Sequence, residues 1–215
     1  MKAILCKEYG PAEKLVIEEV PSPEVKGRGV KVRVKAAGLN FPDTLIIENK
    51  YQLKPSLPFS PGGEMAGEVI EVGDKVTRFK VGDRVAGLTG YGAFAEEVIV
   101  PEQNLLPVPD GMSDEKAAAF TMVYGTSYYA LKQRGNLQPG ESLLVLGASG
   151  GVGLATVELG KAMGAKVIAA ASSAEKLAVA KEAGADELIN YAEEPLKDAV
   201  KKLTHSKGVD VIYDP

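Results

Sequence analysis

The chain has 215 residues, of which 45% are hydrophobic and 25% charged, a composition that suits a globular protein with one large core or two modest ones. Its formal net charge of −4 offers no basic surface, so nucleic acid is not an expected partner. No apolar run approaches the roughly 18 residues that cross a membrane, and residues 1–6 lack the layout of a signal peptide. We therefore expect no membrane partner.

The first half of the chain has the pattern of β-structure broken by turns. Cys6 is the only cysteine, so no internal disulfide can form, and we expect a small buried thiol in the first strand of a cytoplasmic protein. Residues 30–35 alternate apolar and basic side chains, as a half-buried strand does. Gly73-Asp74 and Gly82-Asp83 separate valine-rich runs and predict tight turns. The glycine-rich segment 90–94 either lines a pocket or forms a turn.

The second half alternates strands with helices. Ser113 is a suitable N-cap for a helix that begins near Asp114. Strands are expected at 142–147, 166–171, 187–191 and 209–213, with helices at 152–163, 174–183 and 195–204. This order predicts a parallel sheet with right-handed crossovers. We therefore predict a mixed α/β chain with domains at 1–122 and 123–215. Because a doubly wound dinucleotide fold has about six strands, we expect the second domain to be incomplete and the chain to be a fragment.

A glycine-rich turn joins the first of these strands to the helix that follows it. The apolar run Leu143–Leu146 leads into the turn, which runs from Gly147 to Gly153. Such glycines let the backbone approach a pyrophosphate, whose charge is met by free N–H groups at the start of the helix. A glycine triplet between a strand and a helix therefore predicts a dinucleotide site. Its predicted members are Ser149, Gly150, Gly151, Val152 and Gly153.

The tip of the second strand indicates which dinucleotide binds. Proteins that bind NAD usually place an acid there, on the ribose hydroxyl, whereas this strand ends in Ser172 and Ser173, and Lys176 follows. A hydroxyl and a lysine suit a 2′-phosphate, so Ser172 and Lys176 favour NADPH. Alternatively, Ser172 and Glu175 form a capping box and Lys176 is only solvated. Tyr191 ends the third strand near the same pocket and either contacts the ribose phosphate or packs on its neighbours.

Three motifs of the chain resemble one known family. They are the segment 61–69 (PGGEMAGEV) with Gly73 and Val76 after it, the segment 38–44 (GLNFPDT), and the segment 125–131 (GTSYYAL) with the glycine turn. Together they resemble the medium-chain dehydrogenases/reductases, and within them the zinc-free quinone oxidoreductases of the zeta-crystallin type. The resemblance implies a GroES-like partial β-barrel followed by an incomplete doubly wound Rossmann domain, and a homodimer for a full-length protein.

The resemblance also implies that no metal is bound. In zinc-dependent relatives two cysteines and a histidine hold the catalytic metal, and the matching positions here are Asn40, Gly63 and Met122. None of them is a serviceable zinc ligand. The four cysteines of the family's structural zinc lobe are missing, and we expect His205, the only histidine, to lie on the surface.

Without a metal to polarise a carbonyl, the resemblance implies hydride transfer from NADPH to an acceptor that is already electron-poor, a quinone or an α,β-unsaturated carbonyl. Asn40 matches the family residue that hydrogen-bonds the nicotinamide ribose or the acceptor, although asparagine is also favoured in turns. Thr126 matches a threonine beside the nicotinamide. Tyr51 falls where related enoyl-thioester reductases carry a proton donor, and its alternative is a loop aromatic that only packs. Glu64 places an acid next to Gly63, one of the positions that match a zinc ligand, where we expect it only to fix the loop.

Two other functions remain open from the sequence. One is an enoyl-thioester reductase, for which we identify no basic groove that would hold an acyl carrier. The other is a non-catalytic relative that keeps the fold and the nucleotide site, because fold alone does not establish activity.

Overall fold

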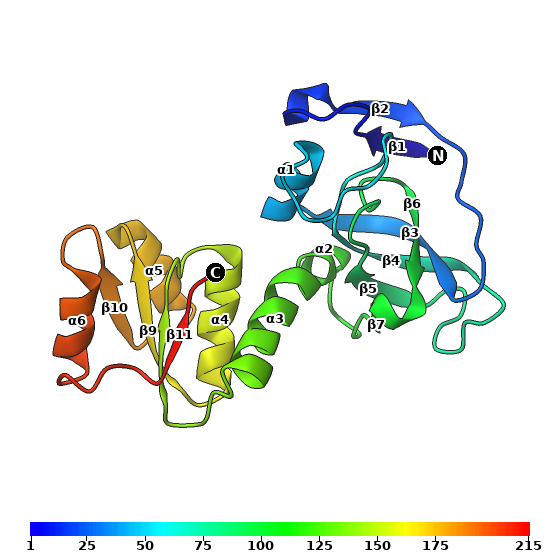
Figure 1. Ribbon diagram of the computed structural model, residues 1–215. Helices are drawn as coiled ribbons and strands as arrows, with labels where there is room; N and C mark the ends of the chain where they lie inside the picture. The colour runs from blue at the N-terminus through cyan, green and yellow to red at the C-terminus, as the bar shows by residue number, and fades with distance from the viewer. The chain divides into compact units, whose positions relative to one another are not determined.

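The computed structural model describes all 215 residues, which form two compact units, Met1–Met122 and Val123–Pro215. The first unit is built mainly from antiparallel strands, and the second alternates strands with helices around a parallel sheet (Figure 1). The predicted mixed α/β class is confirmed.

The first unit is organised around a five-stranded antiparallel sheet in the order β6-β3-β4-β5-β7, with a separate ribbon of β1 and β2. Helices α1 and α2 complete it, with single 3-10 turns at Ala12–Lys14 and Glu102–Asn104. The elements are β1 (Lys2–Leu5), β2 (Val16–Glu19), β3 (Gly29–Gly38), α1 (Phe41–Ile47), β4 (Glu64–Val72), β5 (Arg84–Leu88), β6 (Glu97–Pro101), β7 (Leu105–Pro107) and α2 (Asp114–Ala118).

The core of this unit lies under β3 and β4, where Val30, Val32 and Met65 are completely buried. The alternating segment forms part of β3, and its three valines, Val30, Val32 and Val34, all contribute to this core. Lys31, between two of them, is buried as well, and its amine forms an ion pair with Glu71 at 2.6 Å. The thiol of Cys6 is buried just after β1, and burial raises its pKa.

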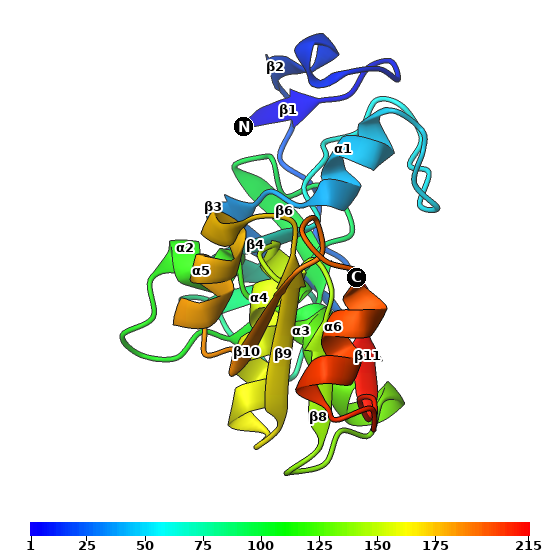
Figure 2. The same cartoon turned by 90° about the vertical axis from the view of Figure 1, so that its left-hand side faces the viewer.

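The second unit is a parallel sheet in the order β10-β9-β8-β11 (Figure 2). Helices α4 and α5 pack on one face of the sheet and α6 packs on the other, which is a doubly wound arrangement. All four expected strands and the three helices after the glycine turn are present. The elements are α3 (Thr121–Tyr128), a π-helical turn (Tyr129–Arg134), β8 (Ser142–Val145), α4 (Gly151–Ala162), β9 (Lys166–Ala171), α5 (Ala174–Glu182), β10 (Glu187–Asn190), α6 (Leu196–Leu203) and β11 (Val211–Tyr213).

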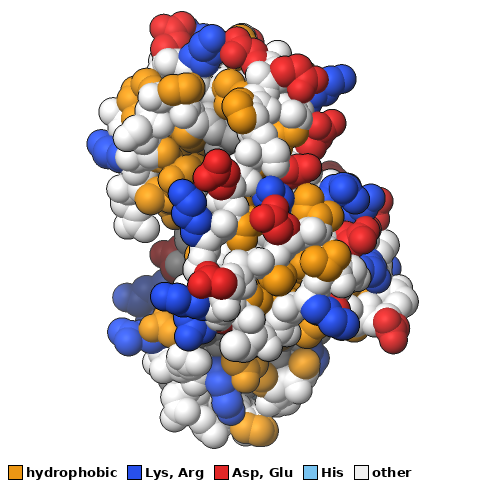
Figure 3. Space-filling model, turned by 90° about the vertical axis from the view of Figure 1, so that its right-hand side faces the viewer, with side chains coloured by type: hydrophobic (Ala, Val, Ile, Leu, Met, Phe, Trp, Pro, Cys, Tyr) orange, Lys and Arg blue, Asp and Glu red, His pale blue; other side chains and the backbone are white.

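The surface agrees with the small net charge. On the face shown in Figure 3, acidic and basic side chains are intermingled over most of the area, and no continuous basic surface crosses it. No helix has both the length and the apolar character that a membrane crossing would require.

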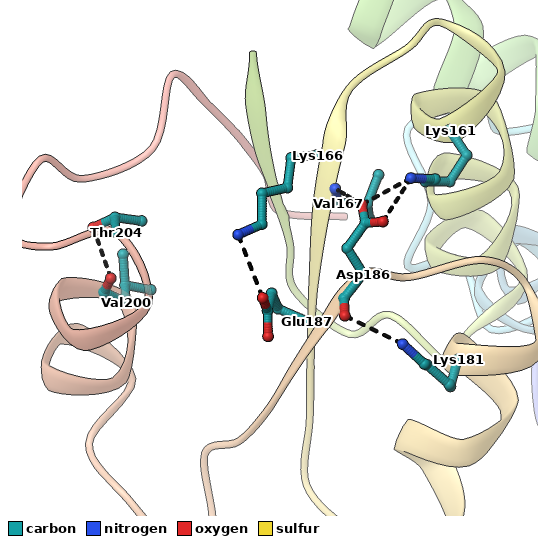
Figure 4. A network of polar contacts seen from close by, with 8 residues as sticks. All are labelled: Lys161, Lys166, Val167, Lys181, Asp186, Glu187, Val200 and Thr204. Atoms are coloured by element: carbon teal, nitrogen blue, oxygen red, sulfur yellow. Dashed lines mark hydrogen bonds and ion pairs between the residues drawn. The ribbon is translucent and has the colours of Figure 1, made fainter. Parts of the chain in front are cut away.

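One polar network holds α4 and α5 to the edge of the parallel sheet (Figure 4). The Asp186 carboxylate accepts hydrogen bonds from Lys161 Nζ at 2.7 and 2.9 Å and from the Val167 N–H at 2.7 Å. Lys181 Nζ donates to the backbone oxygen of Asp186 at 3.2 Å. Burial alone would raise the pKa of Asp186, but the hydrogen bonds from Lys161 and Val167 outweigh it and lower the pKa.

Candidate cofactor and acceptor sites

The glycine turn has no room for side chains at its closest point. Gly147 has φ +56°, in the left-handed region that favours glycine. A Cβ atom on Gly153 would lie 2.4 Å from the Gly147 oxygen and 2.8 Å from Ala148 Cα, so that α4 can begin directly against the turn only with glycine there. The Ala148 N–H donates to the Ala170 oxygen at 3.2 Å and ties the turn to β9.

The start of α4 can hold an anion. Gly150 is its N-cap and has no side chain to satisfy the first N–H groups of the helix. The N–H groups of Gly151, Val152 and Gly153 occupy the first turn, where an α-helix offers no internal acceptor. Ser149 lies in the turn just before them and is partly buried. A phosphate group at this helix end would meet both the N–H groups and the positive end of the helix dipole.

Helix α3 is fastened to this first turn of α4 by buried hydroxyl groups. Ser127 is completely buried, and its Oγ donates to the Val152 oxygen at 3.1 Å. Thr156 Oγ1 donates to Ser127 Oγ at 3.0 Å. One helical turn earlier, Tyr124 hydrogen-bonds to Glu158, which raises the pKa of Tyr124 to about 12. Thr126, beside Ser127, remains exposed and available to a ligand.

The predicted phosphate residues lie at the carboxyl ends of neighbouring parallel strands. Lys176 Nζ donates to Ser172 Oγ at 3.0 Å. The cap of α5 is Ser173, whose Oγ accepts the Lys176 N–H at 3.4 Å and whose hydrogen bond lowers the pKa of Glu175. The alternative capping box on Ser172 is therefore wrong by one residue, because Ser173 is the last extended residue before the helix. Ser172 is left free of the cap.

Tyr191 follows β10 at the same edge. Its N–H donates to the Ala171 oxygen at 3.1 Å, and the residue is 44% exposed. The ends of three neighbouring strands thus bring together the glycine turn after β8, Ser172 after β9 and Tyr191 after β10. This is the edge at which doubly wound sheets bind ligands.

In the first unit, Asn40 is held by two buried carboxylates. The Asn40 N–H donates to Asp43 Oδ2 and its Nδ2 donates to Glu64 Oε1, both at 2.8 Å. Glu64 Oε2 accepts the Met122 N–H at 2.8 Å. Burial raises the pKa of both carboxyl groups, although N–H donors to Asp43 and to Glu64 act in the opposite direction. Neither carboxylate has a Lys or Arg partner within ion-pair distance, since none of the ion pairs of the chain includes them.

A cavity of about 530 Å³ lies beside these carboxylates within the first unit. Its lining includes Asp43, Tyr51 and Gly90. Tyr51 also packs on the apolar cluster around Ile46, so both interpretations of this residue agree with its position. The cavity is completed by Pro42, Ile46, Gln52, Leu53, Gly63 and Met122.

The segment 90–94 contributes only Gly90 to this cavity. Tyr91 packs edge-on against Phe59, with ring centroids 6.1 Å apart. Phe94 fills the space over Gly62, where a Cβ atom would lie 2.6 Å from its ring. The aromatic side chains of the segment therefore support the turn.

Comparison with known proteins agrees with this architecture. Residues 26–110 match the family described as alcohol dehydrogenase GroES-like domain, and residues 151–215 match the one described as zinc-binding dehydrogenase. The chain is 46% identical to the quinone oxidoreductase-like protein 2 homolog of Nematostella vectensis over 99% of its own length and 58% of that protein. It is 42% identical to the quinone oxidoreductase of Pseudomonas aeruginosa over 99% of its length and 66% of that protein.

Solved structures of related proteins have the same fold as this chain. The quinone oxidoreductase of Pseudomonas syringae pv. tomato superposes with a TM-score of 0.93 at 43% identity, covering 99% of this chain and 66% of that one. A probable oxidoreductase from Mycobacterium abscessus superposes with a TM-score of 0.92 at 41% identity, covering 100% of this chain and 69% of that one. The chain belongs to the zinc-free quinone oxidoreductase family of medium-chain dehydrogenases/reductases. It spans 58–61% of the length of the first curated relatives.

Membership in this family confirms the predicted GroES-like and Rossmann folds, and the residues present do not fit zinc. A Cβ atom at Gly63 would lie 3.4 Å from Met122 Cε and 3.6 Å from Asp43 Oδ1, so the matching ligand positions are close together. They carry no thiolate or imidazole, and no group of three His, Cys, Asp or Glu side chains forms a metal site in the chain. His205 is exposed, as expected.

Sequence reasoning missed Ser127, Thr156 and Asp43. The hydroxyl pair lies 29 residues apart in the chain, and no spacing rule connects such a pair. Asp43 had a usable signal, because an acid three residues after Asn40 is typical of a capping box.

Proposed function

We propose that this chain binds NADPH and transfers its hydride to a quinone or an α,β-unsaturated carbonyl without a metal. The observation that carries the proposal is the pairing of Ser172 with Lys176 at the strand edge that also carries the glycine turn. An anion-binding helix start and a second, side-chain phosphate site at one edge suit a dinucleotide with a 2′-phosphate.

Relatives support the choice of cofactor. The quinone oxidoreductase of Escherichia coli, with a TM-score of 0.93 at 36% identity, was solved as a complex with NADPH. A mycobacterial relative with 34% identity was also solved with NADPH. A third neighbour, with 33% identity, is described as an NAD-dependent alcohol dehydrogenase, so cofactor choice varies among similar structures. For this chain the preference depends on Ser172 and Lys176, where an acid would repel the 2′-phosphate.

The chain's own residues would bind and orient the cofactor and would protonate the reduced acceptor. NADPH, when bound, supplies the hydride. The N–H groups at the start of α4 would bind the pyrophosphate, while Tyr191 lies where it would contact the adenosine ribose. By its match to the family, Thr126 would lie beside the nicotinamide, and the same match gives Asn40 a ribose hydroxyl or the acceptor as its hydrogen-bond partner. The apolar part of the cavity around Ile46 would exclude water from the acceptor.

Proton delivery is assigned to Tyr51. After hydride addition to the β-carbon of an enone, the resulting enolate must gain one proton. The Tyr51 phenol would donate it, and the phenolate would recover a proton from water. Tyr51 lines the same cavity as Asp43, which is where a small acceptor would be enclosed. A quinone, by contrast, yields a hydroquinone anion that water can protonate directly.

Cofactor selectivity is the first test. Titration of NADPH and NADH by reduced-cofactor fluorescence suits this chain because it contains no Trp. We expect NADPH to bind more tightly. Lys176→Ala should reduce the NADPH affinity about tenfold and leave NADH unchanged, because a charge-assisted phosphate contact is lost. Lys197→Ala, an exposed lysine on α6, is the matched control. Equal affinities of the wild type for both cofactors would refute the proposed preference.

Acceptor choice is the second test. NADPH oxidation should be measured with a quinone, an enone and an enoyl-thioester, on this chain and on a longer form. Turnover of the first two supports the proposal, while turnover of the thioester alone would favour an enoyl-thioester reductase. NADPH binding without any turnover would favour a non-catalytic relative.

A homodimer for the full-length protein and a cytoplasmic location stay predictions.

A further inference from the structure

Glu64 is a buried acid that the proposed chemistry does not use. It is 2% exposed and begins β4, directly opposite Gly38 at the end of β3. A Cβ atom on Gly38 would lie 2.5 Å from Glu64 Oε1 and 2.8 Å from its Cγ. The absence of a side chain at Gly38 therefore makes the space that the Glu64 carboxylate occupies. A carboxylate placed in this way needs N–H partners, since burial without them is strongly unfavourable.

The partners of Glu64 are of two kinds. Oε2 accepts the backbone N–H of Met122 at 2.8 Å, and the backbone of Thr121 contributes a further hydrogen bond. These donors belong to the main chain and cannot turn round. Oε1 accepts from Asn40 Nδ2 at 2.8 Å, and this amide is a side chain that can turn round. An ionised carboxylate only accepts hydrogen bonds, so it tolerates the NH₂ end of the Asn40 amide and rejects its oxygen.

We infer that Glu64 is a positioning residue that, together with the Asp43 N–H in the capping box of α1, fixes the orientation of the Asn40 amide, so that Nδ2 faces Glu64 and Oδ1 is the acceptor that a ligand can reach. The inference rests on the proposed function. Asn40 then binds a hydrogen-bond donor, such as a ribose hydroxyl of the cofactor.

The substitution Glu64→Gln tests this orientation because it changes few atoms. A glutamine at this position has one side-chain oxygen. This oxygen would accept the hydrogen bonds from the backbone N–H groups of Met122 and Thr121, which cannot change direction. The glutamine NH₂ then faces Asn40, whose amide must invert to offer its oxygen. The inverted Asn40 presents NH₂ to the ligand, so the hydrogen bond to a ligand hydroxyl changes its required direction.

The binding experiment uses four chains: wild type, Glu64→Gln, Asn40→Ala and the double variant. At about pH 8, well above the ordinary pKa of a carboxyl group, we expect Glu64→Gln to weaken NADPH binding about 3- to 10-fold, the worth of one hydrogen bond. In the Asn40→Ala background the same substitution should have no further effect. Glu68→Gln, on the same strand and partly exposed, is the matched control. An equal loss in both backgrounds, or no loss in either, would overturn the inference.

A second measurement is independent of cofactor binding. The side-chain Nδ2 resonance of Asn40, identified by its absence in Asn40→Ala, should shift as Glu64 titrates. Asp43 is the other carboxyl group that faces Glu64, so the component that disappears in Glu64→Gln is the one to follow. Absence of such a component would overturn the inference. If wild type failed to bind NADPH, the proposed function would fail, while this titration would still decide the role of Glu64.

Discussion

The two candidate sites of this chain are built in opposite ways. Around Gly147–Gly153 the site consists of backbone N–H groups and of space that side chains leave empty. Around Asn40 the site consists of side chains, with the carboxylates of Asp43 and Glu64 arriving from a helix and a separate strand. The first is encoded in one continuous segment, and the second depends on distant segments meeting.

This difference predicts different kinds of sensitivity. A site made of backbone N–H groups loses its binding geometry when a side-chain atom is added, because the neighbouring backbone leaves no space for that atom. A side-chain site fails when a donor is exchanged for an acceptor at constant volume. The pKa values of the buried acids differ as well. At Asp43 and Glu64 burial dominates and raises each pKa. At Asp186 burial also acts to raise the pKa, but the hydrogen bonds from Lys161 and Val167 outweigh it and lower the pKa.

The largest effect is expected from Gly153→Ala. The added methyl group would meet the Gly147 oxygen at 2.4 Å, so the turn must move away from α4. We expect a loss of about 1–3 kcal/mol in the free energy of unfolding and no detectable NADPH binding. Urea denaturation and fluorescence titration measure the two effects. Gly125→Ala on α3, where an added Cβ meets nothing within 4 Å, is the control and should not destabilise the chain. A stable, binding-competent Gly153→Ala chain would break the contrast between the sites.

The second effect concerns the side-chain site. Tyr51→Phe removes one hydroxyl group from the cavity and should slow enone reduction about 10- to 100-fold, with a smaller effect on quinone reduction, because only the enolate requires a positioned proton donor. Steady-state rates with both acceptors measure this. Tyr91→Phe, which makes the same change outside the cavity lining, is the control. Equal effects on both acceptors would indicate that Tyr51 only packs.

A smaller effect is expected from Asp186→Asn, which weakens the network in Figure 4. Because the folded pKa of Asp186 is lowered, its contribution is present above the unfolded value of about 3.9 and is lost as the pH falls through the folded value. Its side chain is 33% exposed, so solvent screening limits the expected loss at neutral pH to about 1 kcal/mol. Thermal unfolding at several pH values measures this. The variant and wild type should converge in acid, and Glu194→Gln, an exposed acid, should match wild type throughout.

The smallest expected effect is that of metal removal. Exhaustive chelation should leave NADPH oxidation unchanged, since Asn40, Gly63 and Met122 offer zinc no ligand set. A zinc-dependent alcohol dehydrogenase treated in parallel should lose its activity. Loss of turnover that added metal restores would show that the first unit holds a metal after all.

Local sequence was sufficient for much of the second unit. Strand periodicity, helix caps and the glycine turn are properties of adjacent residues, so β9 has its predicted bounds and α5 begins at its predicted residue. The capping residue was misplaced by one, because Ser172 and Ser173 are chemically the same and only the backbone conformation distinguishes them.

The sequence by itself determined the α/β class and the glycine turn, because each follows from residue types at short spacing, while the lack of zinc ligands follows from the resemblance to the family. Only the tertiary structure decided what surrounds Asn40. Gly38 and Glu64 are opposite each other through strand pairing, and the Met122 N–H reaches Glu64 from 58 residues away. A buried carboxylate takes whichever donors the fold brings to it. For this reason, the orientation of one amide depends on contacts that no local pattern predicts.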